Sequence, residues 1–590
     1  MQVLLPEGDP LKTLHSGRVM AKAWSRTLGA DKHLIQAQNF IRQAISIYWQ
    51  VVHESSLRQK PLPALQYHLT KSKLDNATLA VAGAVGRAAA HLGVIEAAYY
   101  LGNIYTAVLP EGIRSGNGVF YTPPGLTQRL IDMATLGGVA WDKARVADPA
   151  CGGGAFLAPV ALKMMEALPD LSNIQFLEHL ERHLKGYELD PFAAWLTQVF
   201  LEIAVKDRIS GAGRRMRNLV TVCDTLEYSF EREEKFDLVI GNPPYGKLKL
   251  SEQTKLKYKD SLFGHPNLYG LFTHLALNMV KTNGVVGYLT PTSFLSGEYF
   301  KNLRQYILST ATPLEIDFVA VRKGVFDDVL QETMLATYRK AKFKRSKVLV
   351  NEITTSIYDE SIIERLGDFS LPTKKSEPWI LPRSIGQSLS VPAMVKMSNR
   401  LSNWGFRIST GQLVWNRHKE QLNDSYKKNA YPVIWSEAVT QDGEFIHRAE
   451  KKNHSFWFHY NGEEFLLTTR PCILLQRTTS KEQEKRLNAA VLPQSLLDKR
   501  KAVVIENHLN MIFPVTESPP VSLEVVCAFL NSRAVNDAFR TISGSVAVSA
   551  YELESLPIPS PSKLKKLTQL VAEKAHKALI EKECYELYTL

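Results

Sequence analysis

The order of hydrophobic and polar residues divides the chain into stretches of different character. Residues 33–110 are rich in Ala and Leu, and within them ATLAVAGAVGRAAAHLGVIEAAYYLGNIYTAVL has apolar residues on more than one helical face. That pattern is typical of a helix packed between others. From about 115 to 340, short apolar strands alternate with helical stretches. Beyond about 370 the alternation fades and aromatic and basic residues are interspersed, which indicates a second, irregular domain.

The middle stretch predicts an α/β fold. Its apolar strands are ARVAD (144–148), LKGYELD (184–190), NLVTVCD (218–224), FDLVIGN (236–242) and GVVGYLTP (284–291). Strands that alternate with helices are typical of a doubly wound, Rossmann-like sheet, mixed but mostly parallel. Several of these strands end in Asp, Glu-x-Asp or Asn. Ligands bind outside the carboxyl ends of such strands, so polar residues at successive ends predict a site there.

These patterns predict five segments. We expect an N-terminal helical region, a sheet domain, a linker, an irregular mixed domain and a charged amphipathic C-terminal helix, at 1–114, 115–345, 346–379, 380–560 and 561–590.

Composition narrows the class of protein. Five scattered cysteines without a C-x-x-C pair argue for a reducing compartment, and against a disulfide framework or a zinc site. No apolar run is long enough to span a bilayer and no basic leader precedes an apolar core, so we expect a cytoplasmic protein without a metal. The formal net charge of +12 favours a polyanionic partner, although the same excess would also serve solubility alone.

A glycine-rich turn follows the first predicted strand. In ADPACGGGAFL (147–157), three glycines let the backbone turn sharply and let a ligand approach it closely. The spacing is not G-x-G-x-x-G and no Lys-Ser/Thr follows, so an adenosine-bearing cofactor other than a dinucleotide or ATP is favoured. Glu188 ends the second strand, where an acid accepts hydrogen bonds from ribose hydroxyls or caps a helix. Asp224, after the third strand, is either an adenine ligand or an ordinary loop residue.

A rigid corner follows the fourth strand. DLVIGNPPYG (237–246) ends an apolar run with Asn242-Pro243-Pro244-Tyr245. Each proline fixes its own φ and restricts the residue before it, and neither has an N–H. The corner therefore offers carbonyl acceptors beside one amide side chain and one aromatic ring.

Five sequence motifs occur in the same order as in a known protein family. FYTPP (120–124), DPACGGGAFL (148–157), GYELDP (186–191), CD (223–224) and GNPPY (241–245) resemble the gamma class of S-adenosylmethionine-dependent DNA adenine-N6 methyltransferases of restriction–modification systems. NLYGLFTHLALNMVKTNGVVGYLTPTSFL (267–295) resembles the sheet and helix after their catalytic corner. More loosely, STGQLVWNR (409–417), CILLQRTT (472–479) and AYELESLPIP (550–559) resemble their target recognition regions.

The resemblance implies a role for each site residue. S-adenosyl-L-methionine would be held by Tyr121, Thr122, Asp148, Ala150, Gly152, Gly154, Glu188 and Asp224. The catalytic corner would be Asn242, Pro243, Pro244 and Tyr245, where the Asn242 side-chain oxygen and the Pro243 carbonyl accept the two N6 protons of a flipped adenine. The base would stack on Tyr245 and on Phe326, which also suits a core position.

Double-stranded DNA is the implied partner, together with a cognate restriction endonuclease that acts on the same site. The expected DNA contacts are Arg417, Lys419, Arg477 and Lys481. A monomer is compatible with one recognition domain per chain.

Other functions stay open on the sequence alone. The same corner suits methylation of protein glutamine or of RNA, but those enzymes usually lack a Tyr-Thr-Pro-Pro block and a large following domain. The chain would also suit the modification subunit of a larger complex. No acid followed by Glu-x-Lys stands out before residue 115, so we do not expect a nuclease centre there.

Overall fold

The computed structural model of the chain describes residues 8–54, 61–113, 122–230, 234–246, 248–320, 332–341, 347–354, 361–372, 374–451, 453–478, 485–543 and 547–589. The chain divides into two compact units. The first comprises Met1–Pro291, Gln305–Val329 and Thr333–Glu364, and the second comprises Thr292–Arg304, Leu330–Glu332 and Arg365–Leu590. Each unit is described by itself below.

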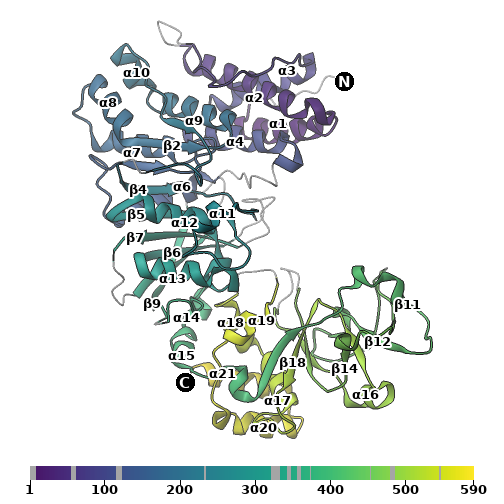
Figure 1. Cartoon of the computed structure of the whole chain (residues 1–590). Helices are drawn as coiled ribbons and strands as arrows, with labels where there is room; N and C mark the ends of the chain where they lie inside the picture. The colour runs from purple at the N-terminus through teal and green to yellow at the C-terminus, as the bar shows by residue number, and fades with distance from the viewer. Residues whose placement is uncertain are drawn as a thin grey trace. The chain divides into compact units, whose positions relative to one another are not determined.

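A nine-stranded sheet forms the centre of the first unit (Figure 1). Its order is β3-β2-β1-β4-β5-β7-β6-β8-β9. Pairing is parallel from β3 through β5 and between β6 and β8, while β7 runs antiparallel between β5 and β6. The strands are β1 (Val146–Asp148), β2 (Leu184–Glu188), β3 (Val220–Val222), β4 (Phe236–Gly241), β5 (Val280–Pro291), β6 (Thr312–Ala320), β7 (Thr333–Arg339), β8 (Lys347–Thr354) and β9 (Ile362–Ser370). The predicted mixed, mostly parallel sheet is therefore present.

Helices connect and cover these strands because their apolar faces share the sheet's core. Buried residues of α6, α7, α8 and α9 pack with strand residues such as Val146, Leu238 and Leu289. The helices of this part are α6 (Pro124–Leu136), α7 (Leu157–Ala167), α8 (Asn173–His183), α9 (Pro191–Ala204), α10 (Lys206–Ala212), α11 (Glu252–Lys257), α12 (Leu268–Met279) and α13 (Lys301–Thr310). The strand order reverses between β1 and β4, and ligands bind at such a switch point in doubly wound sheets.

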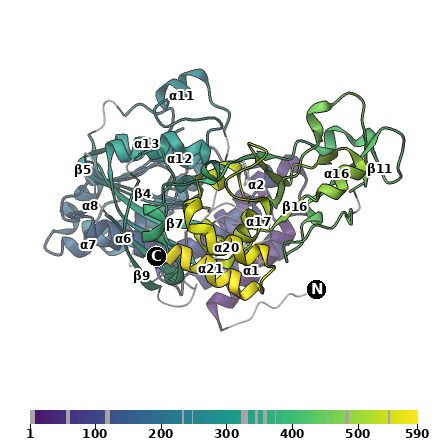
Figure 2. The same cartoon turned by 90° about the horizontal axis from the view of Figure 1, so that it is seen from below.

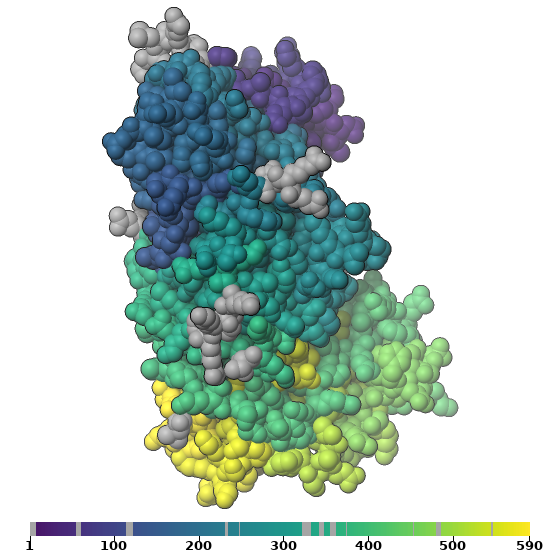
Figure 3. Space-filling view, turned by 60° about the vertical axis from the view of Figure 1, so that its left-hand side comes forward, coloured from purple at the N-terminus to yellow at the C-terminus, as the bar shows by residue number. Residues whose placement is uncertain are grey.

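The N-terminal helices belong to the same unit as the sheet. They are α1 (Pro10–Ser25), α2 (Ala30–Val52), α3 (Asn76–Ala89) and α4 (Val94–Val108), and they share one buried cluster with the apolar face of α9. On the surface, the purple N-terminal residues lie beside the blue residues of the sheet domain (Figure 3). Two side-chain hydrogen bonds fasten α9 to this region: Tyr105 donates to Asp190 at 2.7 Å and Trp195 donates to the Pro63 carbonyl at 2.8 Å. The helices therefore extend the core of the central sheet.

The second unit combines two small sheets with helices. One sheet has the order β10-β18-β15-β16 and the other β11-β13-β12-β17-β14. The strands are β10 (Phe406–Thr410), β11 (Leu422–Asn423), β12 (Ala430–Ile434), β13 (Trp457–His459), β14 (Leu467–Thr468), β15 (Ile473–Gln476), β16 (Ala489–Val491), β17 (Val503–Ile505) and β18 (Leu509–Pro514). The helices are α14 (Ile385–Ser388), α15 (Val391–Lys396), α16 (Gln494–Arg500), α17 (Leu523–Leu530), α18 (Arg533–Arg540), α19 (Ala550–Ser555), α20 (Lys565–Ala572) and α21 (Lys577–Thr589).

Two predicted segments are corrected by the structure. The expected linker at 346–379 contains β8 and β9, because Val348 and Val350 are buried where β8 pairs with β6. The expected single C-terminal helix at 561–590 is two helices, α20 and α21, which lie side by side (Figure 2). The chain turns at Lys574, whose φ is +50°, so that Leu567 and Leu587 enter the same core.

No helix within the described residues is long and apolar enough to cross a membrane.

Candidate active site

The ends of four neighbouring parallel strands bring the predicted site residues to one edge of the sheet. Asp148 ends β1, Glu188 ends β2, Asp224 follows β3 and Asn242 follows β4. The Cys223 N–H donates to the Glu188 carbonyl at 2.9 Å, which ties the end of β3 to the end of β2. The sequence pattern therefore located this edge correctly, and the tertiary structure supplies the contacts between the strands.

The glycine turn wraps around the end of β2. The Gly152 N–H donates to Glu188 Oε2 at 2.8 Å, and the Thr197 hydroxyl donates to the Gly152 carbonyl at 2.7 Å. Gly154 has φ +84° and lies so close to α9 that a Cβ would stand 3.1 Å from the Thr197 Cα. Glycine is required there because a side chain would meet both backbone strain and a steric contact.

Glu188 and its neighbour Asp190 have different tasks. Asp190 is the N-cap of α9 and accepts the Phe192 N–H at 2.9 Å. Glu188 is no cap: its two oxygens accept the N–H groups of Gly152 and Asp190. The cap interpretation of the Glu-x-Asp motif therefore applies to its second acid, and Glu188 stays a predicted cofactor ligand.

Asp148 is the most deeply buried acid of the site. Its side chain is 1% exposed, and its Oδ1 accepts the Ala150 N–H at 3.0 Å. Burial raises the pKa of Asp148 to about 8, the hydrogen bond from Ala150 opposes the rise, and the charge of Glu188 adds to it. Burial likewise raises the pKa of half-buried Glu188 to about 7, against the hydrogen bonds from Asp190 and Gly152.

Asp148 also touches the start of the Asn-Pro-Pro-Tyr corner. A Cβ on Gly241, the last residue of β4, would stand 2.6 Å from Asp148 Oδ1. Only a glycine at this position lets the carboxyl group lie against the backbone that leads into Asn242. The glycine immediately before the motif was the one sequence signal for this contact.

Asn242 is anchored by the segment that precedes α6. Its Nδ2 donates to the Thr122 hydroxyl at 3.2 Å, across 120 residues of sequence. Thr122 is 2% exposed, and Pro123 and Pro124 start α6 directly after it. The sequence predicted Thr122 only as a cofactor ligand, and its contact with Asn242 could not be read from the sequence.

Tyr245 is fixed at the other end of the corner. Its hydroxyl donates to the Leu289 carbonyl of β5 at 3.3 Å, and its ring meets Tyr269 of α12 edge-on, with the centroids 6.1 Å apart. Burial raises the pKa of Tyr245, so the phenol stays protonated. The ring therefore has a fixed orientation.

The remaining predicted residues are distributed as follows. Pro243 is buried and Pro244 half-buried. Tyr121, Phe326 and Lys481 lie outside the described residues. Asp224 is exposed, and its Oδ1 accepts the Leu226 N–H at 3.0 Å.

The predicted DNA contacts in the second unit differ in their surroundings. Arg417 and Lys419 are exposed, and the Lys419 ammonium lies 5.4 Å from the centroid of the Trp415 ring. Arg477 is half-buried and donates to the Asn507 carbonyl at 2.8 Å. At least one N–H of Arg477 thus supports the fold of this unit.

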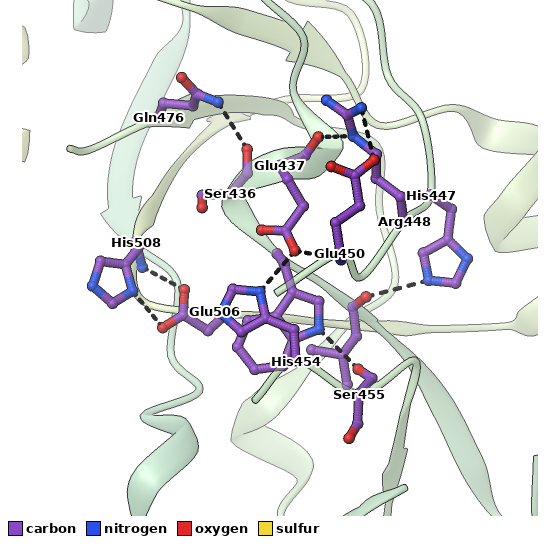
Figure 4. A network of polar contacts seen from close by, with 12 residues as sticks. Ser436, Glu437, His447, Arg448, Glu450, His454, Ser455, Gln476, Glu506 and His508 are labelled. Atoms are coloured by element: carbon purple, nitrogen blue, oxygen red, sulfur yellow. Dashed lines mark hydrogen bonds and ion pairs between the residues drawn. The ribbon is translucent and has the colours of Figure 1, made fainter. Parts of the chain in front are cut away.

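A network of polar contacts holds residues 436–451 and 453–455 of the second unit (Figure 4). Glu437 Oε1 lies 2.7 Å from His454 Nδ1 and accepts the Glu450 N–H at 3.0 Å, while Arg448 donates to the Glu437 carbonyl. Burial raises the pKa of Glu437, but the hydrogen bonds with His454 and the Glu450 N–H outweigh this effect and hold the pKa below its usual value. Gln476 of β15 donates to two backbone carbonyls of the same segment. These described residues therefore have a defined conformation with little regular secondary structure.

Comparisons with known proteins agree with this geometry. Residues 183–326 match the Eco57I restriction-modification methylase family. The Type II methyltransferase M.BsuBI of Bacillus subtilis is 24% identical over 477 residues, which cover 78% of this chain and 91% of the relative. M.PstI of Providencia stuartii is 26% identical over 354 residues, or 57% of this chain and 68% of the relative.

The chain is a site-specific methyltransferase of the restriction–modification type. Its fold is similar to that of the type IIL restriction-modification enzyme MmeI, solved in complex with DNA. That similarity has a TM-score of 0.56 at 13% identity and covers 99% of this chain and 93% of that one. In the methyltransferase, the corner at Asn242 lies at the strand edge where ligands bind in this fold.

Proposed function

We propose that this methyltransferase transfers a methyl group from S-adenosyl-L-methionine to N6 of an adenine that is flipped out of double-stranded DNA. The observation that carries the proposal is the contact set around β4. Asn242 is held by Thr122, Gly241 lies against Asp148, and Tyr245 is fixed on Leu289. These contacts support a rigid amine-binding corner beside a cofactor site.

The acidic edge suits a cationic adenosine-bearing cofactor. Burial raises the pKa of both Asp148 and Glu188. Within the described part of the chain, neither carboxylate has an ion-pair partner, so a ligand with positive charge would relieve the cost of burying them. S-adenosyl-L-methionine carries such charge on its sulfonium and ammonium groups, and when bound it supplies an electrophilic methyl group. Tyr121, Ala150, Gly152, Gly154 and Asp224 would complete its binding site.

The Asn242–Tyr245 corner would make the weakly nucleophilic amine of adenine more reactive. The N6 lone pair is delocalised into the purine ring, which makes the nitrogen a poor nucleophile. The Asn242 side-chain oxygen and the Pro243 carbonyl would accept its two protons and draw the nitrogen toward tetrahedral geometry. Such fixed acceptors stabilise the positive charge that develops on N6, and they need no reorganisation during the reaction.

Flipping the adenine out of the duplex costs a few kcal/mol of stacking and pairing energy. The fixed ring of Tyr245 would offset part of this cost by stacking on one face of the flipped base. Phe326 remains the proposed second face. After the transfer, N6 loses one of its two protons to solvent.

The second unit would bind the DNA. Its exposed Arg417 and Lys419 suit phosphate or base contacts, and Lys481 stays a proposed contact of the same kind. A further candidate is Arg500, whose guanidinium carbon lies 4.8 Å from the Trp457 ring centroid and 5.7 Å from that of exposed Tyr426. In a restriction–modification system, methylation would protect the site from a cognate endonuclease.

Product analysis tests the proposal. The protein is incubated with labelled S-adenosyl-L-methionine and separately with DNA, RNA or protein, and the nucleic acids are digested to nucleosides. We expect label in N6-methyladenine from DNA; label confined to cytosine, RNA or protein would contradict the assignment. Sequencing of methylated bases in a host that expresses the chain would give the recognition site.

Asn242→Ala tests the acceptor role. We expect at least a hundredfold loss of kcat with DNA binding retained, because a preorganised acceptor of this kind contributes roughly two to three orders of magnitude. Asn278→Ala is the matched control: Asn278 is an exposed asparagine of α12 that accepts the Tyr306 hydroxyl at 2.9 Å. Normal turnover by Asn242→Ala would refute the role.

A further inference from the structure

Residues 248–266 form an excursion that leaves the catalytic corner and returns to it. At its base, the Leu268 N–H donates to the Gly246 carbonyl at 2.9 Å, and the Gly246 N–H donates to Asn267 Oδ1 at 3.5 Å. Gly246 directly follows Tyr245 in the chain. The excursion is therefore anchored next to the proposed base-stacking ring.

The body of the excursion is bound to the turn after β3. Tyr258 donates through its hydroxyl to the Leu226 carbonyl at 3.0 Å, and the Lys257 ammonium donates to the same carbonyl at 2.6 Å. The Thr254 hydroxyl donates to the Glu227 carboxylate. Tyr258 is 1% exposed and Leu226 is 3% exposed, so their hydrogen bond is shielded from water.

This turn is the one that sets the position of Asp224. The Leu226 N–H donates to Asp224 Oδ1 at 3.0 Å, and the Tyr228 N–H donates to the Asp224 carbonyl at 2.9 Å. Leu226 thus contacts Asp224 through its N–H and Tyr258 through its carbonyl, which belongs to the next peptide group. A displacement of the Tyr258 hydroxyl would therefore shift Leu226, and with it the N–H that binds the Asp224 carboxylate.

The ring of Tyr258 is held independently of its hydroxyl. His274 of α12 meets it edge-on, with the ring centroids 5.1 Å apart. His274 is itself fixed, because its Nδ1 lies 2.8 Å from the Ser261 hydroxyl oxygen and its ring stacks on Tyr306 at 4.0 Å. Removal of the hydroxyl alone would therefore leave the packing of the ring in place.

We propose that Tyr258 is a positioning residue, which holds the Asp224 turn for the adenosine end of the cofactor and links that turn to the Asn242–Tyr245 corner. The link rests on the proposed function in one respect, the identity of the cofactor. The excursion joins two parts of the site that lie at the ends of different strands. Cofactor binding at Asp224 would thereby stabilise the chain next to Tyr245 before the base enters.

Tyr258→Phe is the decisive variant, and binding of S-adenosylhomocysteine without DNA is the decisive measurement. The loss of one shielded hydrogen bond should raise the calorimetric Kd roughly threefold to tenfold. At saturating cofactor, kcat should stay within about twofold of wild type, because the corner itself is intact. Tyr306→Phe is the control: it removes a hydroxyl from the same aromatic cluster, but that hydroxyl binds Asn278 and not the Asp224 turn.

Several outcomes separate the hypotheses. An unchanged Kd in folded Tyr258→Phe, or an equal rise in Tyr306→Phe, would overturn the positioning role, while wild-type binding would still support the proposed cofactor. If wild type failed to bind S-adenosylhomocysteine, the proposed function itself would fail.

Hydrogen exchange tests the link to the corner. S-adenosylhomocysteine should slow amide exchange across 248–266 in wild type and do so less in Tyr258→Phe at equal occupancy. Equal protection of this segment in both proteins, or none in wild type, would overturn the link.

Discussion

The contact between Gly241 and Asp148 gives the sharpest test of the site geometry. In Gly241→Ala, the added Cβ would stand 2.6 Å from Asp148 Oδ1 and 3.1 Å from its Cγ. The backbone has little room to yield, because Gly241 is buried and paired with Tyr288 of β5. The carboxyl group must therefore move, and it must weaken its 3.0 Å hydrogen bond with the Ala150 N–H.

The displacement of the Asp148 carboxyl group sets the expected loss of stability and of cofactor affinity. Overpacking of a filled core costs about 1–3 kcal/mol. For a unit of this size, roughly 2 °C of melting temperature is lost for each kcal/mol, so we expect a decrease of about 2–6 °C. Because Asp148 is a proposed cofactor ligand, the Kd of S-adenosylhomocysteine should rise about tenfold or more, which corresponds to about 1.4 kcal/mol or more.

Gly287→Ala is the matched control. Gly287 is a buried glycine of the neighbouring strand β5, and a Cβ there would make only ordinary van der Waals contacts with Leu130 at 3.5 Å and Ile240 at 3.8 Å. Calorimetry and thermal unfolding of both variants form the assay. Wild-type affinity and melting temperature in Gly241→Ala would refute the contact, and so would an equal loss in Gly287→Ala.

Two predictions concern pH. Because burial raises the pKa of Glu188 to about 7 and ribose hydroxyls would favour its ionised form, S-adenosylhomocysteine affinity should fall as the pH drops below 7, by up to about tenfold per unit. In titration calorimetry, Glu188→Gln should have a weaker pH dependence of S-adenosylhomocysteine affinity below pH 7. Between pH 7 and 8, where Asp148 ionises, the pH dependence should be the same as in wild type. An unchanged profile in Glu188→Gln would contradict the assignment to Glu188. Burial lowers the pKa of His274 to about 4, so between about pH 6.5 and 4 the unfolded chain binds a proton that the folded chain does not. The free energy of unfolding should therefore fall by up to about 3 kcal/mol as the pH drops through this range. Chemical denaturation across that range should show a smaller pH dependence in His274→Phe than in wild type, and equal slopes would rule out His274 as the cause.

Local sequence was sufficient to locate the central sheet and the edge at which its parallel strands end. The apolar runs that end at Asp148, Glu188 and Asn242 are short, and each is bounded by a turn signal, so strand position and strand polarity could both be read. In a parallel sheet, the carboxyl ends of neighbouring strands meet at one edge, so the side chains that follow them had to converge.

Segments without such periodicity were harder to place. The stretch 346–379 lacks the flanking helices that marked the earlier strands, and only pairing with β6 makes β8 part of the sheet. The break between α20 and α21 depends on packing, because one continuous helix could not bring both Leu567 and Leu587 into the same core. In both segments, burial in the tertiary structure produced a different element from the linker and the single helix that the local pattern predicted.

The sequence by itself determined the chemistry available at the site: an amide, two prolines and a ring after one strand, with acids and glycines after its neighbours. Only the tertiary structure decided which of these groups touch. Thr122 reaches Asn242 across 120 residues, Asp148 lies against Gly241, and Tyr258 binds the carbonyl of Leu226, whose N–H contacts Asp224. Such contacts depend on strand order and on the close packing of side chains, and neither is encoded in the spacing of residues along one segment.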